Sequence, residues 1–182
     1  GCGGGSASNP EPTPIAPINP PTTVSYEFNE DLSDFEVNSA DHRVEHITND
    51  KIEIELSTLP EPFEYRQGLK FKWENYSDDM KGFIVRKFDE FEVGEEYEVT
   101  FEVDLVTYIS YECGGIGGSP SESVVIKGAI LNYKPERSVQ GDPFEYYRVN
   151  VQDSQNGRSE GDEVVFIGDI GLPTACVLDP EL

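Results

Sequence analysis

Basic residues are scarce in this sequence. Its 182 residues include 13 Lys and Arg against 36 Asp and Glu, which gives a formal net charge of -23 at pH 7. Such a chain repels the phosphate backbone of a nucleic acid and offers it no cationic surface. The composition therefore argues against nucleic-acid binding. The acids are typical of a soluble exported protein, and the alternative interpretation is that they bind a divalent cation.

Long hydrophobic runs and cysteines are scarce as well. No stretch approaches the roughly 18 apolar residues that a membrane-spanning helix needs, and no charged start leads into an apolar signal core. We therefore expect the printed chain to be a processed form. Three cysteines are present. In an exported protein this number predicts one cysteine with a separate role and two that can pair.

Residues 1–23 have the composition of a linker. They hold four of the 17 Gly and six of the 13 Pro, with Glu11 as the single charged residue. Gly and Ser give flexibility, and the Pro-rich part favours extended polyproline II at about 3.1 Å per residue, a reach of roughly 60 Å. We expect residues 24–182 to form one acidic domain behind this linker.

Cys2 stands at the start of this linker and is followed by three Gly and a Ser. This pattern resembles the start of mature bacterial lipoproteins, in which the first cysteine carries the lipid. The resemblance implies anchoring of Cys2 in a membrane of the bacterial cell envelope, with the domain facing the periplasm or the cell surface. The linker then holds the acidic domain many Debye lengths, each about 8 Å, from anionic lipid.

The folded part shows short runs of β-branched and aromatic residues with a period of two. The clearest runs are KIEIELS at 51–57 and YEVTFEVDLV at 97–106, where apolar and acidic residues alternate. No amphipathic helix competes with these patterns. The full set of predicted strands is 24–28, 43–47, 51–57, 69–73, 82–88, 97–106, 123–131, 146–151 and 163–167.

About nine strands separated by turn signals predict an all-β fold. The expected architecture is a two-sheet antiparallel β-sandwich, with a jelly roll preferred over an immunoglobulin-like arrangement. The opening SYEFNEDLSDFEV resembles the start of lectin-like jelly rolls, in which an aromatic strand leads through an acidic turn to a second aromatic residue.

The segment WENYSDDM at 73–80 is the first candidate site. It contains Trp73, Tyr76, Asp78 and Asp79. Aromatic rings next to carboxylates suit sugar binding, because a ring stacks on the apolar face of the sugar and carboxylates accept its hydroxyls. The alternative interpretation is a buried Trp beside an acidic turn.

The segment CGGIGGSPSESV at 113–124 is the second candidate site. A phosphate-binding loop should open a helix and carry a lysine, whereas this one leads into the predicted strand SVVIKGAIL, so we interpret it as a structured turn. Cys113, at its start, can pair with Cys176 in a disulfide that contributes about 4 kcal/mol in the chain-entropy model. The alternative for Cys113 is a buried free thiol.

NYSDDM, SPSESV, VIKGA and VVFIGDI together resemble an uncharacterised family of bacterial exported lipoproteins with a lectin-like jelly-roll domain. The resemblance spans residues 75–170 and implies a shared fold and export, with no established activity. This chain departs from the family pattern at Ser121, where the family has Gly, and in QDSQNGRSEGD at 152–162.

If the chain binds a metal ion, we expect carboxylate oxygens rather than histidines to be the ligands. The predicted strand 43–47 would place His42 and His46 about 13 Å apart, too far to share a zinc ion. Calcium fits the abundant carboxylates better and is a structural ion of many jelly-roll modules. The candidate ligands are Asp78, Asp79, Asp153 and Asp162.

The leading functional hypothesis is a membrane-anchored lipoprotein that presents a non-catalytic binding module for glycans. The first alternative is a structural or adhesive envelope protein that binds other proteins. The second is a carboxylate-based hydrolase such as a glycosidase, for which the many acids of the chain supply pairs without singling one out. No G-x-S-x-G elbow supports a serine hydrolase.

Overall fold

The computed structural model describes residues 22–48, 52–74, 79–114, 118–153 and 157–174. Cys2, Tyr76, Asp78 and Cys176 lie outside these residues, and so does most of the predicted linker. The described part contains nine short strands and two single-turn helices. In chain order they are β1 Glu36–Ala40, β2 His42–Arg43, α1 Glu45–Thr48, β3 Ile52–Thr58, β4 Gln67–Trp73, β5 Lys81–Val85, α2 Pro120–Ser123, β6 Val125–Gly128, β7 Arg137–Gln140, β8 Tyr146–Val149 and β9 Val165–Asp169.

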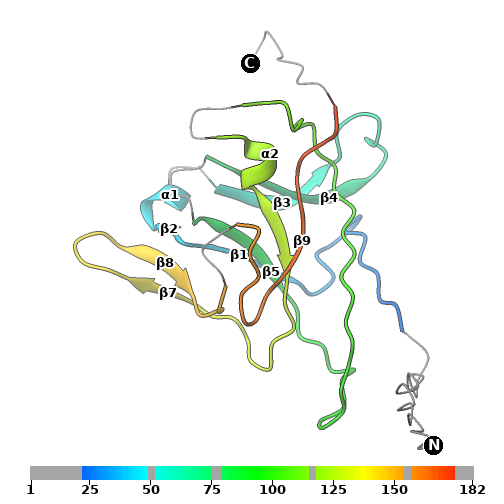
Figure 1. Cartoon of the computed structure of the whole chain (residues 1–182), viewed down its shortest axis with the longest axis vertical. Helices are drawn as coiled ribbons and strands as arrows, with labels where there is room; N and C mark the ends of the chain where they lie inside the picture. Colours follow the sequence, from blue (N-terminus) through cyan, green and yellow to red (C-terminus); the bar gives the residue numbers. More distant parts are fainter. Residues whose placement is uncertain (1–21, 49–51, 75–78, 115–117, 154–156, 175–182) are drawn as a thin grey trace, which may run out of the picture.

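The strands form several small antiparallel sheets (Figure 1). Three of these sheets are pairs, β1 with β5, β3 with β4, and β6 with β9. The fourth has the order β2-β8-β7. The all-β prediction is thus confirmed at the level of a mostly β chain with few helices. No helix among the described residues is long and apolar enough to cross a bilayer.

The β3–β4 pair follows directly from its sequence. Its register places Ile54 opposite Phe71 on one face, while Glu53 lies opposite Lys72 and Glu55 opposite Lys70 on the other. The Lys70 ammonium lies 2.9 Å from the Glu55 carboxylate. Cross-strand pairs of opposite charge and of apolar side chains both stabilise a sheet. The alternation that predicted these two strands therefore also fixes their pairing.

The apolar side chains of β4 pack on β5. A Cβ on Gly82 would lie 2.8 Å from Phe71 Cδ1 and 3.0 Å from Trp73 Cζ3. The two rings meet edge to face, with centroids 6.1 Å apart. Gly82 thus allows the aromatic side chains of one sheet to approach the backbone of another, and any larger residue would push the two sheets apart.

Among the described residues, those at the junction of β1 and β2 form the longest buried run. Ala40 and His42 have no exposed surface, and Ser39 and Asp41 are also buried. Asp41 has φ 59°, in the left-handed region that Asp tolerates better than most residues. The chain changes partner at this residue, because β1 pairs with β5 while β2 pairs with β8. Asp41 therefore joins two sheets.

Six of the predicted strands are confirmed with shifted ends, those that became β3, β4, β5, β6, β8 and β9. The prediction for 43–47 is wrong beyond Arg43, because the chain turns into α1. Residues 24–28 and 97–106 are not strands, since neither has a hydrogen-bonded partner strand in the described part of the chain. The sequence analysis missed β1 and β7, whose apolar alternation is weak.

Residues 24–35 pack through aromatic rings instead of a sheet ladder. The Tyr26 ring meets that of Phe35 edge to face at 5.0 Å, and Phe28 also contacts Phe35 at 5.6 Å. The Arg86 guanidinium lies 4.7 Å from the centre of the Tyr26 ring. The aromatic residues of SYEFNEDLSDFEV thus form a small apolar cluster with the residues that follow β5.

Candidate functional site

The structure describes two of the four predicted residues of the WENYSDDM site, Trp73 and Asp79. Trp73 is half-buried and packs over Gly82, and Asp79 is exposed. Tyr76 and Asp78 lie outside the described residues. The contact with Gly82 gives Trp73 a packing role between β4 and β5. Its role in ligand binding stays a prediction.

Cys113 is disulfide-bonded. Residues 109–111 run beside Leu172, with the Leu172 amide donating to the Ile109 carbonyl at 2.8 Å and the Tyr111 amide donating to the Leu172 carbonyl at 3.0 Å. The Ser110 hydroxyl also donates to the Thr174 carbonyl. Residues 172–174 are therefore fixed beside residues 109–111, which lie shortly before Cys113 in the chain. The pairing with Cys176, which lies outside the described residues, stays a prediction.

The two histidines are closer together than predicted. The 13 Å separation assumed a strand, but α1 turns the chain, and the rings of His42 and His46 stack with centroids 6.1 Å apart. The geometric argument against zinc was therefore wrong. Within the described residues, however, no group of three or more His, Cys, Asp or Glu side chains is placed to hold a metal ion.

Of the four predicted calcium ligands, Asp153 has cationic partners. Its carboxylate accepts from the Lys127 ammonium at 2.7 Å, and Lys81 lies 4.0 Å away. Asp79 and Asp162 are exposed, and Asp78 lies outside the described residues. The charge of Asp153 is thus already balanced by lysine. Calcium binding at Asp78, Asp79 and Asp162 stays a prediction.

His42 is a buried neutral imidazole. Its Nδ1 lies 2.8 Å from the Arg43 carbonyl, which can only accept, so Nδ1 carries the proton and donates. Its Nε2 lies 2.9 Å from the Ser39 hydroxyl, which then donates to it. Burial lowers the pKa of His42 below its usual 6.5, because it disfavours the charged ring.

The buried imidazole predicts a loss of stability in mild acid. Because the folded-state pKa of His42 is depressed, its contribution is fully present above pH 6.5 and is lost as the pH falls through the folded-state pKa, at up to about 1.4 kcal/mol per pH unit. Urea unfolding at pH 8 and pH 5.5 checks this. From pH 8 to pH 5.5, the free energy of unfolding of His42→Gln should fall by less than that of the wild type. Equal losses would contradict the prediction.

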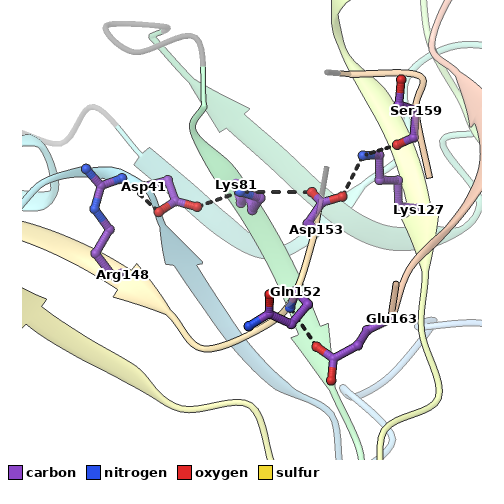
Figure 2. A network of polar contacts seen from close by, with 8 residues as sticks. All are labelled: Asp41, Lys81, Lys127, Arg148, Gln152, Asp153, Ser159 and Glu163. Carbon is purple, nitrogen blue, oxygen red and sulfur yellow. Dashed lines mark hydrogen bonds and ion pairs between the residues drawn. The ribbon is translucent and has the colours of Figure 1, made fainter. Parts of the chain in front are cut away.

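A row of alternating charges joins the strands β5, β6 and β8 through Asp41 and Asp153, which lie outside the strands. Figure 2 shows that the row runs across the molecule in the spatial order Arg148, Asp41, Lys81, Asp153 and Lys127. The Asp41 carboxylate accepts from Arg148 at 2.9 Å and from Lys81 at 2.6 Å. The Asp41 side chain is 12% exposed. Each buried charged side chain contacts a side chain of the opposite charge. The row can therefore link the small sheets without leaving a buried charge unpaired.

A cleft opens between β2 and the β7–β8 hairpin. Its volume is about 590 Å³, and its lining residues are Arg43, Val44, Glu45, Gly141, Asp142, Pro143, Phe144 and Glu145. Gly141 shapes the hairpin loop: its φ is 109°, and a Cβ there would clash with the Phe144 carbonyl oxygen. Only glycine takes this conformation readily. The glycine thus positions the Phe144 segment beside β2.

Arg43 and Phe144 form the centre of this cleft. The guanidinium carbon of Arg43 lies 4.4 Å from the centre of the Phe144 ring, and Phe144 remains 57% exposed. The guanidinium donates to the Tyr146 hydroxyl at 3.4 Å and to the Glu45 carboxylate at 3.2 Å. The bond with Tyr146 and then that with Glu45 raise the pKa of Arg43 above its usual value. Arg43 is thus a fixed cation over one face of the Phe144 ring, and Phe144 stays more than half exposed.

The chemistry of the cleft is that of a polar ligand site with one aromatic platform. Phe144 can stack on an apolar face, Arg43 can donate hydrogen bonds, and Glu45, Asp142 and Glu145 can accept them. This is the combination of ring and carboxylates that the sequence analysis sought around Trp73. The signal was present in DPFEYY at 142–147 and was missed because the segment is short.

Comparison of the chain with protein-family models, with curated proteins and with solved structures gives no match.

Proposed function

We propose that this chain is a non-catalytic binding module that holds a glycan in the cleft between β2 and the β7–β8 hairpin. The observation that carries the proposal is the exposed Phe144 ring, with the Arg43 guanidinium 4.4 Å from its centre and carboxylates around it. A sugar ring would stack on the face of Phe144 opposite the Arg43 guanidinium, and its hydroxyls would bond to Arg43 and to the carboxylates at the edge of the ring.

The charge of the chain narrows the ligand to neutral or cationic glycans. Three carboxylates and one guanidinium line the cleft, and the whole chain carries a net charge of -23. An anionic sugar would be repelled over the whole approach. Neutral sugars present hydroxyls without this penalty, and amino sugars add an ammonium group for the carboxylates.

The proposal includes anchoring at Cys2 and a jelly-roll sandwich built from residues 24–182. The lipoprotein-like start supports the anchor, and the packing of β4 on β5 through Gly82 supports a layered arrangement. The surface of the cell envelope is where a tethered module of this kind would meet glycans. An unlipidated mass for the amino-terminal peptide of the protein from its native membrane would rule out the anchor.

The test of the proposal is a glycan array probed with the full chain and with Phe144→Ala. We expect binding to neutral or amino-containing glycans and about tenfold weaker binding by the variant, because the stacking platform is lost. Phe63→Ala is the matched control, since Phe63 is 39% exposed and does not line the cleft. Equal binding by all three proteins, or a silent array, would contradict the proposal. Cleavage of a bound glycan would favour the hydrolase.

A further inference from the structure

A second surface, distinct from the cleft, is formed by the arm, which we define as residues 86–109. Figure 1 shows the arm in green, leaving the sheets after β5, turning, and running back beside the molecule. The amide of Glu95 donates to the carbonyl of Glu92 at 3.3 Å and closes the turn. The returning part, YEVTFEVDL at 97–105, has the alternation of a strand.

This returning part has no strand partner among the described residues. No strand is assigned to it, and none of its backbone amide or carbonyl groups takes part in a backbone hydrogen bond within the described chain. Unpaired N–H and C=O groups along an extended segment are a template for the addition of another strand.

One face of the segment is apolar and incompletely covered. Phe101 is its anchor, because the ring occupies the space beside Gly128 of β6, with Cδ2 2.8 Å from where a Cβ would lie. The other apolar residues of the segment are exposed to solvent: Tyr97 by 45%, Val103 by 51% and Leu105 by 45%. A row of half-exposed apolar side chains on a soluble protein marks an interaction surface.

The β3–β4 sheet shows what such a segment pairs with in this protein. β3 has the same alternation of apolar and acidic residues, and its partner β4 alternates apolar residues with lysine. Lys70 bonds to Glu53 at 3.0 Å and to Glu55 at 2.9 Å. The arm has the chemistry of β3 and no counterpart to β4 within the described residues.

We propose that residues 97–105 bind an extended strand of another protein whose side chains alternate apolar and basic residues. The partner's backbone pairs with the free groups of the segment. Its apolar side chains lie beside Tyr97 and Val103 and complete the cover over β6, because paired strands direct opposed side chains to the same face. Its basic side chains lie opposite Glu98, Glu102 and Asp104.

A second copy of this chain does not meet these requirements. Pairing two arms would bring acidic segments together, and each copy carries a net charge of -23. Like charges directly opposite one another destabilise a sheet. The charge of the arm therefore selects a basic partner over self-association.

The experiment uses the full chain and a fluorescent synthetic peptide in which lysine alternates with valine and phenylalanine, followed by anisotropy. The arm variant combines Glu98→Gln, Glu102→Gln and Asp104→Asn. The matched control combines Glu90→Gln, Glu92→Gln and Glu95→Gln, which removes the same charge from the turn of the arm. A second peptide of identical charge carries N-methylated backbone amides.

We expect the peptide to bind the wild type and the control, to bind the arm variant about tenfold more weakly, and to lose binding when its amides are methylated. Equal weakening by the control, or retained binding of the methylated peptide, would show simple charge attraction and overturn the proposal. Absence of binding to the wild type would overturn it too, as would a dimer that the arm variant abolishes. None of these outcomes depends on the glycan cleft.

Discussion

Asp41→Asn is expected to lower the free energy of unfolding by about 2 kcal/mol. The substitution preserves the shape of the side chain and, because Asn also tolerates the left-handed region, the φ of 59°. What it removes is the charge between Lys81 and Arg148 (Figure 2). Both cations would then lose an anion that is 12% exposed. We place the effect below that of a fully buried pair because Lys81 is 35% exposed.

Urea unfolding of Asp41→Asn and of Asp89→Asn measures this difference. Asp89 lies 2.5 Å from Lys87 on the surface, and both side chains are more than three-quarters exposed. This control removes the same charge from an acidic chain and should change the stability by less than about 0.5 kcal/mol. Equal effects of the two substitutions would mean that the charged row contributes nothing specific at Asp41.

Gly82→Ala is expected to destabilise the chain by about 1 to 3 kcal/mol. The added Cβ would lie 2.8 Å from Phe71 Cδ1 and 3.0 Å from Trp73 Cζ3. The added Cβ would force these rings, or the strand β4 that carries them, away from β5, so the strain falls on the contact between two sheets. Trp73 is the single tryptophan, and its fluorescence should change in the folded variant.

Gly168→Ala is the matched control for this substitution. Gly168 also lies in a strand, β9, but a Cβ there would meet nothing within 4 Å. We expect a neutral or slightly stabilising effect, because alanine loses less backbone entropy on folding. Thermal unfolding of both variants tests the prediction, and a stable Gly82→Ala chain would show that β4 does not pack on β5 as described.

The strands that sequence predicted best are those whose partner carries a matching pattern. Ile52, Ile54 and Leu56 of β3 face Trp73, Phe71 and Leu69 of β4 in the observed register. Local alternation and cross-strand chemistry agree there, so a local signal is enough. The same reasoning found most of β5, β6, β8 and β9.

The arm shows why equally clear alternation can fail. A period of two predicts an extended segment with one apolar face, but a strand also requires a hydrogen-bonded neighbour, which is a property of the whole fold. Residues 97–106 have the alternation but, within the described chain, no hydrogen-bonded neighbouring strand. Conversely, β1 has weak alternation and forms because β5 offers it a partner.

The proposed cleft has the chemistry that the sequence predicted, an aromatic ring among carboxylates, but it lies elsewhere in the fold. A site around Trp73 stays a prediction. The cleft brings that combination together at Phe144, in the loop between β7 and β8, with Arg43 of β2 more than 100 residues earlier in the chain. The contact of Arg43 with Phe144 depends on the pairing of β2 with β8, which no local pattern reveals.

The most direct test of the glycan proposal is an amide chemical-shift titration of the isotopically labelled full chain with a glycan that the array selects. We predict saturable shifts at Arg43, Gly141, Phe144 and Glu145, the residues around the cleft. Shifts confined to Trp73 and Asp79, or the absence of any saturable shift, would contradict the placement of a glycan in this cleft.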